Sequence, residues 1–365
     1  MEKIDKNLYN FITCLSNDNK VNCFIYYNKK YPLYNILKSN DIHIEDEYLF
    51  INALFCKASK EQIFALSKLS DVKYISSISV ACCQINVSKN ILNVKDFKYS
   101  GRGINVAFID TGISPHADFM LGENRVKFFK DFIDDKKTLY DDNGHGTFVC
   151  GVCSGGGYLS KFRYAGIAPK SNLYVLKALN KNGEATANKI LDAMEWIFDN
   201  HEKENIKVVC MSFGSEPIGY NDPIMLGANA LWRDGVVVVA AAGNSGPKEN
   251  TIKSPGISPE IITVGGIDDN RFDEDSFNKD FFEMANFSSR GPALRHYKPD
   301  LVAPSVDITS VATPMIAGVV CLMLECYPNL SPIEIKARLL RGCTSIGFDA
   351  NSEGYGVPNL KRILR

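Results

Sequence analysis

From residue 103 onward, hydrophobic residues form short continuous runs that are separated by longer segments of helical periodicity. Strands are predicted for the runs at 105–109, 173–176, 208–211, 236–241 and 261–264. Continuous apolar runs are typical of parallel strands that are covered on both faces. Helices are predicted between them, for example at 187–200 and 223–234. This alternation predicts a three-layer α/β/α domain around a parallel sheet.

The first 81 residues follow a different pattern, in which the strands and helices are shorter. Strands are predicted at 21–27, 48–56 and 73–81, and a helix is predicted at 32–38. The segment Ser59-Lys-Glu-Gln62 is a capping box that opens a second helix, with Ile63, Leu66 and Leu69 on one face. Residues 1–81 are therefore predicted to form a small α/β domain.

The segment 82–98 is polar and shows neither helical nor strand periodicity. A chain of 365 residues also exceeds the usual size of one domain. We therefore predict that 82–98 is a linker and that 99–365 forms the larger domain.

Composition narrows the class of protein. Hydrophobic residues make up 45% of the chain and charged residues 23%, as in soluble globular proteins. The formal charge of −1 gives no reason to expect a nucleic-acid partner. The apolar stretch 315–324 is too short to span a membrane and predicts a buried helix.

The cysteines indicate whether the protein lies in a reducing or an oxidising compartment. The first residues, Met-Glu-Lys-Ile-Asp-Lys-Asn, lack the apolar region of a secretory signal, so the eleven cysteines are expected to be thiols. Cys150-Gly-Val-Cys153 has the spacing of a redox or zinc pair. No second Cys or His pair lies nearby to complete a zinc site, so buried thiols on a helix are predicted.

Three residues with catalytic chemistry lie in three separate frames. Asp110 lies in Val-Ala-Phe-Ile-Asp-Thr-Gly-Ile, His145 in Asn-Gly-His-Gly-Thr, and Ser310 in Thr-Ser-Val-Ala-Thr-Pro. An Asp, a His and a Ser can form a nucleophile, its general base and the group that orients the base. Asp110 ends an apolar strand, which would place its carboxylate at the carboxyl edge of the sheet.

The three frames and their order resemble those of the subtilisin-like serine peptidases (subtilases), from about residue 99 to the last residue. The resemblance implies a serine endopeptidase whose substrate is a peptide or protein. Residues 1–81 resemble the propeptide domain of that family, which acts as an intramolecular chaperone and inhibitor; an unrelated domain is the alternative. Because no secretory signal is seen, we expect a cytoplasmic or spore-associated location, and the chain also resembles clostridial spore-germination members of the family.

The resemblance also implies roles for residues outside the triad. Asn244, in Ala-Ala-Ala-Gly-Asn-Ser-Gly, matches the oxyanion-hole asparagine, and the Ser310 N–H at the start of its helix would be the second donor. The alanines and Gly243 fit a narrow floor under a substrate side chain. Substrate-binding edges are expected at Gly183 and at Ser212, Phe213 and Gly214, where an extended peptide would pair as a strand.

The sequence allows calcium binding but does not identify its ligands. Many subtilases bind it, but the acidic clusters at 131–135 and 273–275 lack a defined ligand spacing, so no metal ligand is assigned. No other cofactor is expected.

One departure lies beside Ser310. Subtilases carry a hairpin between Ala-Pro-Gly-Val and Gly-Thr-Ser, whereas here Ala303-Pro-Ser-Val306 runs almost directly into Thr309, with Ile308 in place of the usual glycine. We expect the fold to survive this omission and the activity to fall. The alternative function is a catalytically silent subtilase that acts as a binding or regulatory protein.

Overall fold

The computed structural model describes residues 3–4, 8–9, 12, 20–28, 30–48, 52–77, 98–269, 282–305 and 308–364. Contacts between residues divide the chain into two units, Met1–Cys82 and Cys83–Arg365, which are described separately. The predicted linker 82–98 lies outside the described residues except for Lys98, and the acidic cluster 273–275 lies wholly outside them.

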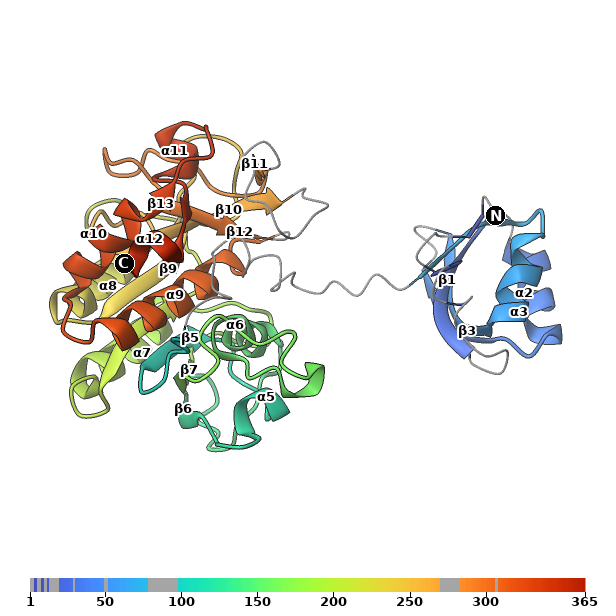
Figure 1. The fold of residues 1–365 in the computed structure, drawn as a ribbon, viewed down its shortest axis with the longest axis horizontal. Coiled ribbons are helices and arrows are strands. Elements are labelled where there is room, and N and C mark those ends of the chain that lie inside the picture. The colour runs from blue at the N-terminus through green and yellow to red at the C-terminus, as the bar shows by residue number, and fades with distance from the viewer. Residues whose placement is uncertain are drawn as a thin grey trace. The chain divides into compact units, whose positions relative to one another are not determined.

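The first unit contains an antiparallel sheet with two helices packed on it (Figure 1). The strand order is β2-β3-β1-β4. The strands are β1 (Lys20–Tyr27), β2 (His43–Tyr48), β3 (Ala53–Ser59) and β4 (Val72–Ser77), and the helices are α2 (Lys30–Ser39) and α3 (Lys60–Ser67). Ile25, Leu54 and Leu66 are among the side chains buried between sheet and helices.

The predicted capping box is confirmed. The Ser59 hydroxyl accepts from the Gln62 N–H, and the Gln62 side chain accepts from the Ser59 N–H at 2.8 Å. The prediction of a single strand over 48–56 is wrong, because β2 ends at Tyr48 and β3 begins at Ala53. The chain reverses between them at Asn52, whose φ is 51°. Strand β2, His-Ile-Glu-Asp-Glu-Tyr, is too polar to be recognised from hydrophobic pattern alone.

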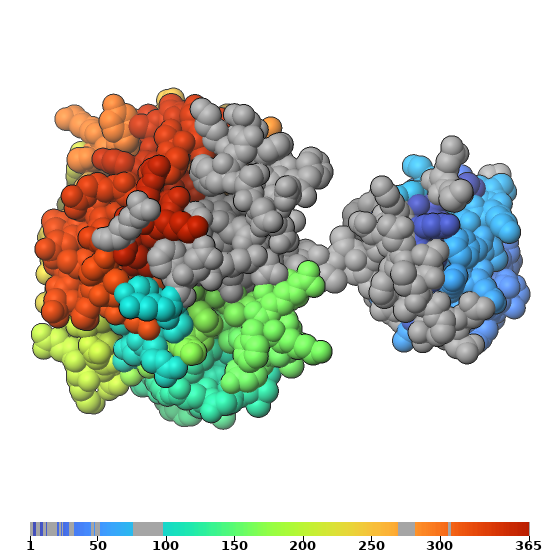
Figure 2. Space-filling model, viewed as in Figure 1, coloured from blue at the N-terminus to red at the C-terminus, as the bar shows by residue number. Residues whose placement is uncertain are grey.

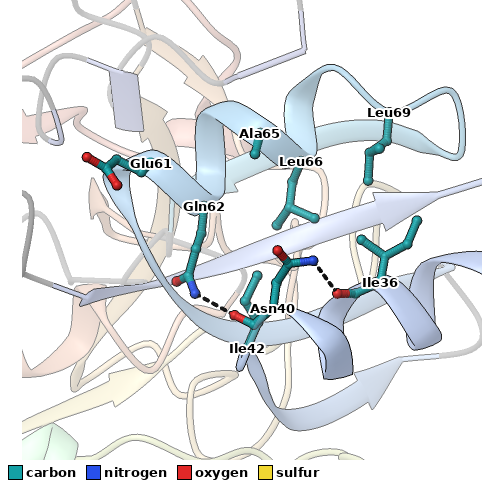
Figure 3. Close-up of a pocket in the computed structure, with 8 residues that line it drawn as sticks. All are labelled: Ile36, Asn40, Ile42, Glu61, Gln62, Ala65, Leu66 and Leu69. Atoms are coloured by element: carbon teal, nitrogen blue, oxygen red, sulfur yellow. Dashed lines mark hydrogen bonds between the residues drawn. The ribbon is translucent and has the colours of Figure 1, made fainter.

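A shallow groove of about 320 Å³ lies between α2 and α3 (Figure 3). The side chains that line it are mainly aliphatic, including Ile36, Ile42 and Leu66. The Gln62 amide donates to the Asn40 carbonyl at 2.8 Å and so ties the start of α3 to the turn that follows α2.

The second unit is built on an eight-stranded sheet with the order β11-β10-β9-β8-β5-β7-β6, in which β12 also pairs with β10. All pairs are parallel except β10 with β11. The strands are β5 (Asn105–Asp110), β6 (Val126–Asp131), β7 (Asn172–Lys177), β8 (Ile206–Met211), β9 (Val237–Ala241), β10 (Ile262–Asp269), β11 (Phe282–Met284) and β12 (Leu301–Pro304). The five strands predicted from apolar runs correspond to β5, β7, β8, β9 and β10.

Helices form the other two layers of this unit (Figure 1). α6 (His145–Ser154) and α9 (Ala312–Cys326) pack on each other and on the central strands, and α7 (Ala187–Asn200) and α8 (Pro223–Arg233) form a second pair. The predicted three-layer α/β/α architecture is therefore confirmed. Helix α9 is buried along nearly its whole length, as its apolar sequence predicts. In Figure 2 the C-terminal segment, orange to red, forms part of the visible surface of this unit.

Shorter elements complete the second unit. They are α5 (Ala117–Met120), α10 (Pro332–Arg341), α11 (Ala350–Glu353), α12 (Leu360–Ile363), the 3₁₀ turn Tyr158–Ser160, and the pair β13 (Cys343–Thr344) with β14 (Val357–Pro358). At the start of α10 the Ser331 N–H donates to the Glu334 carboxylate at 2.8 Å, as in a capping box. Within the described residues, no helix combines the length and hydrophobicity needed to cross a membrane.

The first described residues of this unit are attached to the last turn of α9. The Glu325 carboxylate accepts from the N–H groups of Ser100 and Gly101, both at 2.6 Å. Glu325 lies in the last turn of α9, where a negative charge is unfavourable beside the helix dipole unless donors satisfy it.

Candidate active site

Asp110 and His145 meet at the carboxyl edge of the sheet. Asp110 is the last residue of β5, a central strand, and is buried. Its Oδ1 lies 2.7 Å from Nδ1 of His145, the first residue of α6. An ionised carboxylate can only accept, so Nδ1 carries the proton and Nε2 is left with a lone pair. In its neutral form, His145 can therefore accept a proton at Nε2.

Close backbone packing explains the glycine that follows His145. A Cβ on Gly146 would lie 2.9 Å from the Gly112 nitrogen and 3.2 Å from the Asp110 carboxylate. Any larger residue would push the start of α6 away from β5. The Gly146 N–H also donates to the Thr111 hydroxyl at 2.8 Å.

Asp141 holds the turn that carries His145, although the sequence reasoning did not single it out. Its Oδ1 accepts from the Thr111 hydroxyl at 2.9 Å and the Gly144 N–H at 2.8 Å. Its Oδ2 accepts from the N–H and hydroxyl of Thr147, at 2.8 and 2.6 Å. Its place four residues before His145, in a glycine-containing turn, is the signal that could have identified it.

The buried amine of Lys177 links the same turn to the sheet. Lys177 ends β7 beside Asp110, and its Nζ donates to the Thr111 carbonyl at 2.6 Å and to the Asp142 carboxylate at 2.7 Å. This ammonium is buried but paired, as a buried charge must be.

The surroundings of His145 favour its protonated form. Burial lowers the pKa of His145, but the hydrogen bond and charge of Asp110, together with the charge of Asp141, outweigh it. The pKa therefore lies above its ordinary value of 6.5.

The Ser310 hydroxyl has a partner outside this pair. Its hydroxyl donates to the Ser212 carbonyl at 2.8 Å, and among the described residues no hydrogen bond joins Ser310 to His145. The Ser310 side chain is buried, with 6% of the residue exposed.

Ser310 lies in the first turn that leads into its helix. The Thr313 N–H donates to the Thr309 carbonyl at 3.1 Å, a bond of helical spacing that spans Ser310, and the continuous helix α9 begins at Ala312. The turn is closed by the Val311 N–H, which donates to the Ile308 carbonyl at 3.3 Å, and by the Ser305 hydroxyl, which donates to the same carbonyl. The Ser310 N–H therefore lies at the start of its helix, as expected.

Asn244 is positioned by Thr309. Its Oδ1 accepts from the Thr309 N–H at 2.8 Å and from the Thr309 hydroxyl at 2.9 Å. Because both bonds use the oxygen, the Asn244 amide NH₂ remains available as a donor. Within the described residues the Ser310 N–H also has no acceptor, so two donors lie near the hydroxyl.

The predicted substrate-binding segments are loops that border these groups. Gly183 lies in a turn near the amide of Asn143, two residues before His145. Ser212, Phe213 and Gly214 follow the end of β8, and Ser212 contacts Ser310 directly.

The acidic cluster at 131–135 does not fit calcium. The Asp131 carboxylate accepts from the Ile133 N–H and the Tyr140 hydroxyl, at 2.8 and 2.6 Å, and so caps a turn. Asp134 and Asp135 pair with lysines. The described residues include no group of three or more His, Cys, Asp or Glu side chains placed to hold a metal ion.

The cysteines near the site are unlike catalytic nucleophiles. Cys150 and Cys153 are free and buried on α6. Burial raises the pKa of the Cys150 thiol well above its ordinary value, so the reactive thiolate is disfavoured.

Known proteins resemble this chain in sequence and in fold. Residues 101–357 match the model of the subtilase family, Peptidase_S8. The serine protease AprX of Bacillus subtilis is 38% identical to this chain. The matched region covers 71% of this chain and 65% of the length of AprX. Subtilisin DY of Bacillus licheniformis is 32% identical over 72% of this chain and 91% of its own. The structure of sphericase superposes with a TM-score of 0.64 at 27% identity, over 75% of this chain and 97% of the other. The chain therefore belongs to the subtilase family of subtilisin-like serine peptidases.

Proposed function

We propose that this chain is a serine endopeptidase in which Asp110, His145 and Ser310 act as a catalytic triad. The observation that carries the proposal is the 2.7 Å contact between His145 Nδ1 and Asp110, which leaves Nε2 free to accept a proton. The Ser310 Oγ attacks the carbonyl carbon of the peptide bond while its proton passes to Nε2. His145 then gives that proton to the leaving amine as the C–N bond breaks, and water hydrolyses the acyl-enzyme.

Two further groups stabilise the negative oxygen of the tetrahedral intermediate. They are the amide NH₂ of Asn244 and the N–H of Ser310. The contact of Thr309 with Asn244 supports this role, because a donor that is fixed in advance needs no reorganisation during the reaction. The loops at Gly183 and at Ser212–Gly214 bind the backbone of the substrate.

Turnover is low because Ser310 has to rotate before it can react. Its hydroxyl exchanges the Ser212 carbonyl for His145 in each catalytic cycle. The short connection that ends in Ile308 replaces the hairpin that supports this turn in other subtilases. A misplacement of about 1 Å can cost on the order of a hundredfold in rate.

The first unit is proposed to act as a chaperone or inhibitor of the second, and the protein to work in the cytoplasm or in a spore. The position of the first unit before a subtilase domain supports this role. Addition of residues 1–82 in trans to residues 83–365 should increase refolding yield or inhibit peptide cleavage. If neither occurs while each part is folded by circular dichroism, the role is excluded.

A fluorophosphonate probe tests the enzymatic proposal, because it reacts with an activated serine. Wild type should be labelled, and the Ser310→Ala variant should not. The second candidate function is a silent binding or regulatory protein, and the contact between Ser310 and the Ser212 carbonyl favours it. Folded wild type that is neither labelled nor able to cleave peptides would support that candidate and exclude the first.

A further inference from the structure

Lys253 lies behind two of the segments that border Ser310. Its N–H donates to the Ala242 carbonyl at 2.9 Å, and the next residue, Ser254, exchanges two backbone hydrogen bonds with Ser215, both of 2.9 Å. Segment 253–254 is therefore fixed between the loop after β8 and the loop after β9.

The stem of Lys253 packs against two glycines. A Cβ on Gly214 would lie 2.6 Å from the Lys253 Cβ, and a Cβ on Gly243 would meet its Cγ at closer range still. Gly214 is two residues from Ser212, which contacts Ser310, and Gly243 precedes Asn244. The stem therefore packs against both the segment that carries Ser212 and the segment that carries Asn244.

The side chain of Lys253 is mostly removed from water. Its side chain is 16% exposed, and it forms an ion pair with Glu216, whose side chain is 82% exposed. An exposed partner contributes little net attraction, because water and salt screen it. A second carboxylate that arrives with less contact to water can displace Glu216 from the ammonium.

We propose that Lys253 makes this peptidase select substrates with Asp or Glu as the residue whose carbonyl is attacked. The proposal rests on the function proposed above and names its substrate class. The side chain of that residue enters over Gly214 and Gly243, and its carboxylate takes the place of Glu216 on Lys253. A large apolar side chain would instead have to displace the lysine stem, and a basic one would meet a like charge.

Peptides that differ only at this residue test the selection. Glu and Gln have nearly the same shape, so their ratio of kcat/KM isolates the charge. Wild type should prefer Glu over Gln by about tenfold or more, the size expected for a hydrogen bond to a charged group. Lys253→Met should reduce the ratio to within about twofold, and Lys253→Glu should favour Lys over Glu.

Two further variants serve as comparisons for the Lys253 variants. Glu216→Gln removes the competing carboxylate and should increase the Glu preference. Lys248→Met changes the net charge equally, at an exposed lysine of the neighbouring loop, and should leave the ratio within about twofold. An equal effect of Lys248→Met and Lys253→Met would overturn the proposal, because long-range charge would then explain it.

Binding separates this inference from the catalytic proposal. The affinities of the Glu and Gln peptides for the Ser310→Ala variant are measured by fluorescence anisotropy. Tighter binding of the Glu peptide, lost in Ser310→Ala combined with Lys253→Met, supports the inference even if wild type cleaves nothing and the catalytic proposal fails. Equal binding of both peptides overturns it, whatever the turnover.

Discussion

The Ser310 hydroxyl donates to the Ser212 carbonyl at 2.8 Å, so the proposed nucleophile rests on the segment that would bind the substrate backbone. Under the proposed mechanism, a peptide that pairs with this segment would alter the surroundings of that carbonyl and free the hydroxyl to turn toward His145. The proposal therefore predicts that substrate binding and activation of Ser310 are coupled through one carbonyl oxygen.

Restoring support to the Ser310 turn should increase turnover. A hairpin inserted before Thr309 and ending in Gly in place of Ile308 should increase kcat by about tenfold or more, because small misplacements of a nucleophile are costly. Ile308→Gly without an insertion is the control and should gain less. If wild type already cleaves peptides as fast as the graft, the short connection is not limiting.

The pH dependence of activity and stability should have opposite signs at His145. The base must be neutral, so kcat/KM should rise with pH through a midpoint above 6.5. The stability contributed by protonated His145 beside Asp110 is fully present below 6.5 and is lost as pH rises through the raised pKa. A pH midpoint of kcat/KM below 6.5 in wild type would contradict the geometry of the Asp110–His145 pair.

Removal of the Asp110 charge tests the same pair by mutation. Asp110→Asn should lower kcat by about four orders of magnitude.

Removal of the Asn244 donor should affect kcat more than KM. Asn244→Ala should lower kcat by about a hundred- to a thousandfold. Asn244→Asp keeps an acceptor for Thr309 but loses the NH₂, so it should be no better. Thr309→Val removes one of the two contacts that position the amide and should cost less, about tenfold. Unchanged kcat in Asn244→Ala would exclude the role.

Asp141→Asn should weaken both stability and catalysis. The variant replaces an acceptor oxygen that receives hydrogen bonds, at a cost of about 1–3 kcal/mol in the free energy of unfolding. Burial raises the pKa of Asp141, but its hydrogen bonds outweigh this and hold the pKa below 3.8. Its stabilisation is therefore present above 3.8 and lost as pH falls through the lowered pKa. Denaturant titration checks this, with exposed Asp135→Asn as the control.

Local sequence predicted those parts of the site that depend on neighbouring residues. Asp110 at a strand end and His145 between glycines could be recognised, because their geometry is set within a few residues. The rotation of Ser310 could not, since it depends on how a shortened connection closes around Ile308. Lys253 was missed for a related reason, because its role arises where loops after two different strands meet.

In the first unit, too, local sequence predicted only those features that depend on neighbouring residues. Strand β1 and the capping box at Ser59 were predicted from short patterns. Strand β2 was missed because an edge strand has a single neighbour and can be largely polar. The class of fold was therefore easier to predict than its edges.

The N–H groups of Ser100 and Gly101 donate to Glu325, in the last turn of the helix that follows Ser310. The position of this helix therefore depends in part on residues 100–101. Glu325 lies at the opposite end of the helix that follows Ser310, so a cut beyond Gly101 would leave an unneutralised carboxylate against the negative helix end. If the first unit is removed as a propeptide, we therefore expect the cut to lie before Ser100. The chain thus sets a limit on its own trimming, because a protease that removed more of its amino-terminal side would loosen the helix that carries its serine.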